Sequence, residues 1–425
     1  MKAQTLFLTV AGLCSSFATH AAVVELNDDI KLDWGMDAYV RGHAIDASGE
    51  ESSNGYTSRF RVKTNLILSD GWSINTRWQG YYDWSGDRRH SGGAGTNYTD
   101  GSNSDGLSID LGFVQYADQG LVLRAGRQRA DWAYGFNIEN DRRDRLLAMK
   151  SYQYGNNDQI SLLGIYDLRF AESEYATDLD VYDDVHMYAL AAVGSHGIVD
   201  WGMLWAYFDG GEGNIGDSST GIPQAGYGID YFHNISPFVN VVMNDFSVKA
   251  AANVILSDST DKNGYHTTWG ADGFAGFVET SYQLTPTVKL QAQAIGFVDG
   301  GLVGRGFDTY SGLINNNDRN DPNPISRQFF GGLGHENNDG QLYAARIDWQ
   351  ASELWNIKFA GGQMNIDHNL GSDTDLEATF LDLSTQYQWS KFTDFTVQMS
   401  WADKDIDDLA VMAMVNIKYN YTRDH

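Results

Sequence analysis

The stretch that decides the fold runs from residue 56 to residue 84 and reads YTSRFRVKTNLILSDGWSINTRWQGYYDW. In its second half the apolar residues Trp72 and Trp78 fall on one parity, while the polar residues Asn75 and Arg77 fall on the other. Successive side chains of a strand point to opposite faces, whereas a helix repeats its faces about every 3.6 residues. The stretch therefore predicts two strands, each with one apolar and one polar face, joined by a short turn.

The same alternation recurs along the chain and predicts about eighteen strands. These strands begin near residues 30, 56, 72, 107, 121, 145, 158, 184, 198, 227, 246, 273, 287, 341, 354, 377, 393 and 409. Tight turns such as 69–71 and 195–197 alternate with long polar connections such as 85–106, 130–144 and 299–340. Lipid cannot satisfy backbone hydrogen bonds, so strands cross a membrane only as a closed barrel. The sequence predicts an all-β fold, a transmembrane antiparallel up-and-down β-barrel with short periplasmic turns and long extracellular loops.

Aromatic residues stand near the ends of many predicted strands, among them Trp34, Trp72, Trp201, Trp349 and Trp401. Girdles of aromatic side chains at both lipid interfaces are typical of membrane barrels. A secreted soluble β protein would also alternate, but its sheets face one another and would not need aromatics at both strand ends. The membrane barrel is therefore the favoured interpretation.

The net charge of the chain and its N-terminal segment indicate which class of protein this is. The chain of 425 residues has a formal net charge of −27, which repels the phosphates of nucleic acid. Lys2, the apolar stretch 5–13 and the small residues after it are typical of a secretory signal peptide, which also contains the only cysteine, Cys14. No later apolar run approaches the roughly 20 residues that a membrane helix needs. We expect residues 1–22 to be cleaved and residues 23–425 to form a single barrel domain in a Gram-negative outer membrane.

Positive charge is concentrated in the first third of the chain, where 12 of the 18 arginines lie between Arg41 and Arg145. Arginine is costly on a lipid-facing surface and consecutive strands are neighbours in a barrel, so we expect one positive stripe on the lumen wall. Its predicted members are Arg41, Arg59, Arg61, Lys63, Arg77 and Arg124. Arg127 and Arg129 have the opposite parity and lie either beyond the bilayer or after a bulge. The run 141–145 falls in a predicted connection that can fold over the mouth of the barrel.

Two interpretations of this stripe stay open. Guanidinium groups bind carboxylate, sulfate or phosphate in a two-pronged fashion, so the stripe can be a track for anions. Alternatively, the arginines pair with acids such as Asp33, Asp37, Asp83 and Asp110 and with an inward-folded loop, as a structural ladder that selects no substrate. The connection 299–340 is long enough to form either a lid at the entrance or a solvated surface loop.

Neither a metal site nor a catalytic site is predicted. Acidic glycine- and asparagine-rich loops, such as 209–213 and 258–272, could bind Ca²⁺, but none has the spacing of an EF-hand, and such charge usually keeps loops soluble. The histidines show no spacing typical of zinc ligands. No Ser–His pairing stands out as a catalytic dyad, so we expect no enzyme and no cofactor.

Segments 56–80, 121–136 (LVLRAGRQRADWAYGF) and 141–147 (DRRDRLL) resemble the N-terminal half of the alginate-export-type outer-membrane proteins, in which a GRQ strand leads into an aromatic and glycine segment. The resemblance implies an 18-stranded barrel with an arginine-rich lumen. It also implies that a polyuronate would contact Arg124, Arg127, Gln128, Arg142, Arg143 and Arg145. The second half departs from that family, because its predicted inward residues carry too few positive charges for a pore that is positive all round.

The combined prediction is a porin for passive diffusion of small hydrophilic, anionic solutes such as uronate-type oligosaccharides or organic acids, with Arg129 and the arginines named above lining the lumen. Its other partners would be outer-membrane lipid and lipopolysaccharide, and both a monomer and a homotrimer fit the sequence. One alternative is a non-conducting barrel whose acidic loops act as an adhesin or receptor. A carbohydrate porin with an aromatic slide is a further alternative, which the small number of inward aromatics disfavours.

Overall fold

The computed structural model describes residues 23–47, 53–83, 107–155, 158–170, 185–209, 231–257, 272–318, 321–327, 332–334, 338–368 and 374–419. Its strands are β1 (Val24–Asn27), β2 (Ile30–Ala47), β3 (Ser53–Leu68), β4 (Trp72–Asp83), β5 (Leu107–Asp118), β6 (Leu121–Trp132), β7 (Ile138–Gln153), β8 (Gln159–Phe170), β9 (Val185–His196), β10 (Val199–Asp209), β11 (Tyr231–Met243), β12 (Phe246–Ser257), β13 (Gly273–Thr285), β14 (Val288–Val298), β15 (Asn338–Gln350), β16 (Trp355–His368), β17 (Thr374–Ser390), β18 (Thr393–Ala402) and β19 (Asp408–Tyr419). The predicted signal peptide, the acidic loop 258–271 and most of loop 209–213 lie outside the described residues.

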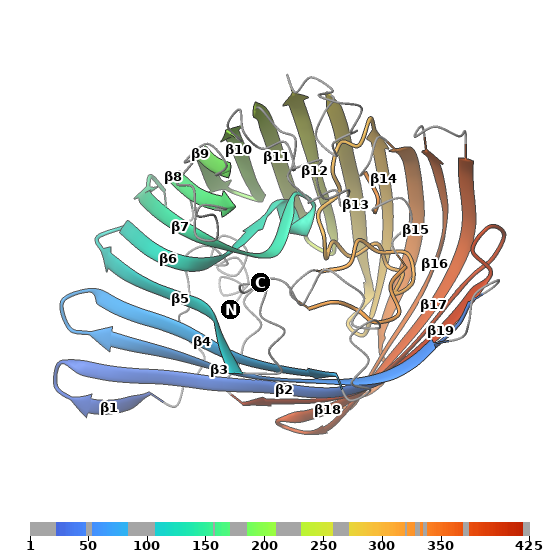
Figure 1. The fold of residues 1–425 in the computed structure, drawn as a ribbon, viewed down its shortest axis with the longest axis horizontal. Coiled ribbons are helices and arrows are strands. Elements are labelled where there is room, and N and C mark those ends of the chain that lie inside the picture. The colour runs from blue at the N-terminus through green and yellow to red at the C-terminus, as the bar shows by residue number, and fades with distance from the viewer. Residues whose placement is uncertain are drawn as a thin grey trace, which may run out of the picture.

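The strands form one closed antiparallel barrel. Each strand from β2 to β18 pairs with the next in sequence, and β19 pairs with β2, from Asp408 opposite Ala47 to Tyr419 opposite Met36 (Figure 1). The short strand β1 pairs with the first residues of β2 and is additional to the 18 strands of the wall. The predicted fold, a transmembrane β-barrel, is confirmed. The assignment of turns and loops to the two sides of the membrane stays a prediction.

The two parities of the deciding stretch face opposite sides of the wall. Trp72 and Trp78 are exposed on the outer surface, whereas Arg59 and Arg77 are buried inside the barrel. The outer surface of a membrane barrel meets lipid, so apolar side chains are exposed there without cost. None of the described helical residues belongs to a helix long and apolar enough to cross a membrane.

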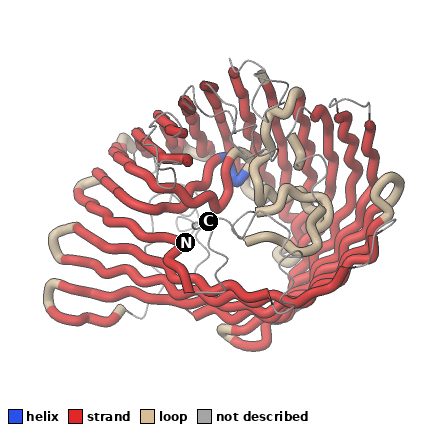
Figure 2. Tube along the Cα trace, in the orientation of Figure 1, coloured by secondary structure: helices blue, strands red, loops and turns tan. Residues whose placement is uncertain are grey.

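A hairpin formed by β6 and β7 leaves the wall and folds into the barrel. The pairing of β5 with β6 ends at Arg127 and that of β7 with β8 ends at Asp144, while β6 and β7 stay paired as far as Trp132 and Ile138. Residues 128–143 therefore make no strand pairing with β5 or β8, and we call them the inward hairpin. The short 3-10 helix η1 (Ala133–Gly135) forms its tip (Figure 2).

The inward hairpin corrects the predicted position of residues 141–145 and locates Arg127 and Arg129. Residues 141–145 do not lie in a long connection, because β7 begins at Ile138, seven residues before the predicted start near 145. The alternation fails there because both faces of the inward hairpin meet protein instead of lipid. Arg127 and Arg129 follow Gly126, which has a φ of 121° where the chain turns away from the wall. A Cβ at this position would clash with the carbonyl oxygen of Gly112 on β5, so glycine permits both the turn and the close approach.

The described residues of the connection between β14 and β15, which are 299–318, 321–327 and 332–334, also fold into the barrel, and we call them the inward loop. It is the orange segment inside the ring of strands in Figure 1. Val303, Leu313 and Ile325 have no exposed surface, and they pack with Phe136 of the hairpin tip in one hydrophobic core. The burial of these residues contradicts a solvated surface loop, and the lid at the entrance stays a prediction.

Candidate functional site: an arginine cluster inside the barrel

The site begins with the register of β2 and β3. Tyr39 lies directly opposite Arg59, and Asp37 lies directly opposite Arg61. Side chains that are directly opposite in an antiparallel pair are about 5 Å apart at Cβ, so the register alone brings an acid, a tyrosine and two arginines together on the inner face. Arg41, two residues after Tyr39, joins the same face. These side chains are all buried, and Arg59 retains only 5% of its surface.

Asp37 binds two of the arginines. Its carboxylate accepts hydrogen bonds from Nε and Nη2 of Arg61 at 2.8 and 2.9 Å, and from Nη2 of Arg59 at 3.2 Å. The two-pronged contact fixes the plane of the Arg61 guanidinium.

The ring of Tyr39 lies close to two guanidinium groups, those of Arg41 and Arg59. The carbon centres of the Arg41 and Arg59 guanidiniums lie 4.7 and 4.5 Å from the centroid of its ring. Cation–π attraction of this kind strengthens when the groups are removed from water. Nε of Arg41 donates to Oγ1 of Thr57 at 2.8 Å. Both guanidiniums therefore contact the ring of Tyr39.

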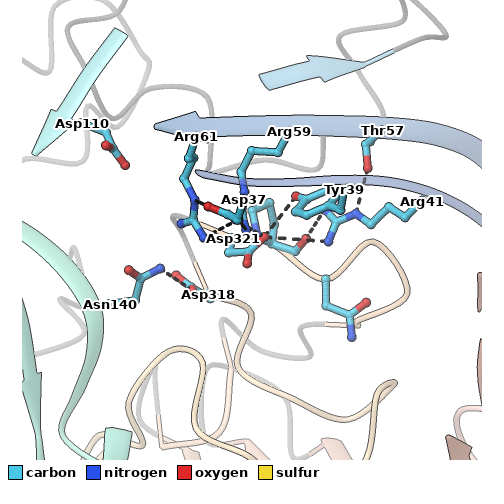
Figure 3. Close-up of polar contacts among 12 residues, drawn as sticks. Asp37, Tyr39, Arg41, Thr57, Arg59, Arg61, Asp110, Asn140, Asp318 and Asp321 are labelled. Atoms are coloured by element: carbon cyan, nitrogen blue, oxygen red, sulfur yellow. Dashed lines mark hydrogen bonds and ion pairs between the residues drawn. The ribbon is translucent and has the colours of Figure 1, made fainter. Parts of the chain in front are cut away.

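The inward loop brings a second carboxylate to this group (Figure 3). Oδ1 of Asp321 lies 2.7 Å from Nη1 of Arg59 and 3.9 Å from Nη1 of Arg41, and it accepts a hydrogen bond from the Tyr39 hydroxyl at 3.1 Å. The carbonyl oxygen of Pro322, the next residue, accepts from Nη2 of Arg41 at 2.5 Å.

Next to this group, Asp110 on β5 binds two further arginines. It has no exposed surface, and its Oδ2 lies 2.8 Å from Nη2 of Arg77 and 2.9 Å from Nη1 of Arg142. Arg142 belongs to the inward hairpin, so this contact joins the hairpin to the wall. Asn140, on the same hairpin, donates to Asp318 of the inward loop at 2.7 Å.

We define the arginine cluster as Arg41, Arg59, Arg61, Arg77 and Arg142. The wall supplies two carboxylates to it, Asp37 and Asp110, and the inward loop supplies Asp321. Asp318 of the inward loop lies nearby and accepts a hydrogen bond from Asn140. The five cations therefore outnumber these acids. Pairing with Asp37, Asp110 and an inward loop agrees with the ladder interpretation, while the surplus of positive charge is what an anion track requires.

The other predicted residues lie outside this cluster and have partners of their own. Arg145 binds Asp167, and Gln128 donates to the carbonyl oxygen of Arg145. Arg127 pairs with Asp144, Arg129 with Asp131, and Arg143 with Asp141. Arg124 donates to Gln115 at 2.7 Å, and Lys63 lies half-buried opposite Arg77 in the register of β3 and β4.

No sequence pattern predicts the contacts that hold the hairpin tip against β11 and β12. Nδ2 of Asn137 donates to Oδ1 of Asn234 on β11 and of Asn253 on β12, at 3.1 and 2.8 Å. Nε1 of Trp132 donates to the carbonyl oxygen of Ser236 at 2.9 Å. Isolated asparagines on barrel strands carry no recognisable spacing, so only the three-dimensional arrangement identifies them.

A second charged group lies on the opposite wall, where the inward loop touches β13 and β15. Tyr310 donates to Glu279 at 2.7 Å, and its ring lies 4.0 Å from the guanidinium of Arg346, which also binds Asp308 at 2.6 Å. Burial and the Glu279 charge raise the pKa of the Tyr310 hydroxyl, so it stays a neutral donor. In this group the arginine is balanced by acids from the loop and the wall.

Nothing in the described part of the chain gathers three or more metal-ligating His, Cys, Asp or Glu side chains. The chemistry available to the arginine cluster is ionic, since guanidinium groups stay charged at any physiological pH and donate to oxygen anions.

Comparisons with known proteins agree with the architecture. No protein-family model matches the chain, and no curated protein matches its sequence. Among solved structures, OccAB3 of Acinetobacter baumannii has a TM-score of 0.58 at 12% identity, over 91% of this chain and 99% of that chain. The outer membrane protein OprD of Pseudomonas aeruginosa has 0.56 at 10% identity, over 92% and 95% of the two chains. OccK3 (OpdO) of Pseudomonas aeruginosa has 0.55 at 11% identity, over 91% and 95%.

At these identities the likeness shows a shared fold. The chain has the architecture of an outer-membrane β-barrel over nearly the full length of each of these proteins. The resemblance of its N-terminal third to alginate-export-type proteins is not confirmed by these comparisons.

Proposed function

We propose that this protein is a porin of the Gram-negative outer membrane that passes small hydrophilic solutes by diffusion and favours anions. The observation that carries the proposal is the arginine cluster, in which five buried guanidinium groups outnumber the neighbouring carboxylates inside a closed barrel. A ring or stripe of one sign of charge at a constriction selects ions of the opposite sign.

The likeness in fold to OccAB3 and OprD supports a barrel of channel type. Carboxylated solutes such as uronates or organic acids suit the cluster best, because a planar guanidinium matches a carboxylate in shape and charge. The barrel would lie in outer-membrane lipid and lipopolysaccharide, without an enzymatic step and without a cofactor.

The test is single-channel conductance in a planar bilayer under a KCl gradient. We expect a reversal potential that favours chloride in the wild type, and loss of that preference in the triple variant Arg59→Ser, Arg61→Ser, Arg77→Ser. A matched control is Arg327→Ser, which removes an arginine of the inward loop whose partner is Asp408, outside the cluster. Addition of oligouronates would then show whether they block the current.

A second candidate is a non-conducting barrel that acts as a surface receptor or adhesin. The packing of the inward loop favours it, because Val303, Leu313 and Ile325 fill part of the interior with a hydrophobic core. Folded protein that never conducts in the bilayer would contradict the porin and favour this candidate.

A further inference from the structure

Asp321 occupies a position that is built like a receptor for a carboxylate. Arg59, Arg41 and the Tyr39 hydroxyl converge on a single oxygen of its side chain. All three of these groups come from β2 and β3, whereas Asp321 is 282 residues away from Tyr39 in the sequence. We call Tyr39, Arg41 and Arg59 the carboxylate site.

The inward loop supplies this carboxylate to a site that is otherwise complete. Arg59 keeps Asp37 as a second partner and Arg41 keeps Thr57, so the wall orients both guanidiniums independently of Asp321. The side chain of Asp321 retains 11% of its surface, more than those of Arg41 and Arg59, at 6% and 4%. The exchangeable member of the set is therefore the one from the loop.

On the basis of the proposed function, we infer that Asp321 is a specificity-determining residue. It occupies the carboxylate site as a tethered counter-ion, and a permeating carboxylate binds there by taking its place. Release of Asp321 would leave Arg59 and Arg41 directed at the solute, while the carbonyl of Pro322 would move away from Arg41 with the loop.

A tethered competitor weakens the binding of solute in proportion to the time it spends in the site. If Asp321 is absent for about one tenth of the time, the apparent dissociation constant of a carboxylate is about tenfold higher than that of the open site. The same residue also cancels one positive charge at the cluster, so it lowers the preference for anions over cations.

The experiment compares Asp321→Asn with wild type in planar bilayers, with glutarate as the probe carboxylate and a KCl gradient for ion selectivity. Heat-modifiable migration in gels verifies that each variant is folded. We expect Asp321→Asn to shift the reversal potential further toward that of chloride and to lower the dissociation constant for glutarate block about tenfold.

Two further variants separate charge from loosening of the loop. Asp321→Glu keeps the carboxylate and should retain nearly wild-type selectivity. Asp408→Asn removes the same charge and weakens another anchor of the inward loop, the Arg327–Asp408 pair at 3.4 Å, without changing the carboxylate site. It should leave the glutarate constant unchanged.

The inference is overturned if Asp321→Asn binds glutarate no more tightly than wild type, or if Asp408→Asn tightens glutarate block as much as Asp321→Asn does. These results differ from a failure of the proposed function, in which the wild type carries no current or its chloride preference survives loss of Arg59, Arg61 and Arg77.

Discussion

At the scale of single residues, the arginine cluster is held together by two carboxylates that each bind more than one arginine. Asp37 binds Arg59 and Arg61, and Asp110 binds Arg77 and Arg142. Removing one partner from a buried charge pair leaves the other charge without compensation, which costs far more than the net contribution of the pair. The shared aspartates are therefore the residues on which the cluster most depends.

Asp110→Asn should destabilise the folded barrel by about 3 to 5 kcal/mol, because it leaves two buried guanidiniums without their common carboxylate. Urea unfolding in lipid vesicles, followed by tryptophan fluorescence, measures this change. Asp144→Asn is the matched control, since the Arg127–Asp144 pair has a carboxylate side chain that is 56% exposed and should contribute less than about 1 kcal/mol. Equal effects of the two substitutions would contradict the role assigned to Asp110.

Arg41→Gln should reduce chloride preference with a smaller loss of stability than substitution of Arg59. Arg41 approaches Asp321 only to 3.9 Å, while Arg59 makes close contacts with two carboxylates. The reversal potential of each variant, set beside its unfolding midpoint, tests this separation. The prediction fails if Arg41→Gln conducts with wild-type selectivity.

At the scale of elements, the inward hairpin depends on one glycine and one network of amides. Gly126 takes the positive φ at which β6 parts from β5. At the far end, Asn253 has no exposed surface and its Nδ2 donates to the carbonyl oxygens of Phe136 and Leu302, at 3.1 and 2.7 Å. Asn253 thus ties the hairpin tip and the inward loop to the same point of β12.

Gly126→Ala should cost at least about 1 to 3 kcal/mol, since the backbone conformation strains any residue with a Cβ and the methyl group would meet β5. Gly80→Ala is the control, because a Cβ at Gly80 meets no atom within 4 Å. Unfolding midpoints in urea compare the two variants. An unchanged midpoint for Gly126→Ala would show that the hairpin does not need this turn.

Asn253→Ala should loosen the hairpin tip and the start of the inward loop together, because each buried polar group left without its partner costs about 1 to 3 kcal/mol. Hydrogen exchange should increase in both segments and stay unchanged in β16. Asn356→Ala is the control, since its hydrogen bond to Gln350 lies at an exposed position. Faster exchange in only one of the two segments would argue against a common anchor.

At the scale of the whole molecule, the wall could be predicted from the sequence because strand alternation is local. Residues 72–83 show their two faces without reference to any other strand. The start of β7 could not be predicted, because residues 138–144 contact Asp110 and the inward loop and do not face lipid, so they lack the alternation of a lipid-facing strand. The arginine positions were recognisable, but their partners depended on register and on a loop residue, Asp321, that is distant in sequence.

The contact of Asp321 with the carboxylate site joins parts of the chain that are far apart in sequence, so we expect it to form late in folding. Wall strands pair with neighbours in sequence, whereas Asp321 reaches Tyr39 and Arg59 across the barrel. Contacts that form after the transition state change the unfolding rate and leave the folding rate almost unaltered. Asp321→Asn should therefore speed unfolding in vesicles at a constant folding rate, and slower folding would contradict this order. Tyr39, Arg41 and Arg59 lie on β2 and β3, whereas Asp321 lies between β14 and β15, so the counter-ion reaches its site only when these two distant parts of the chain have come together.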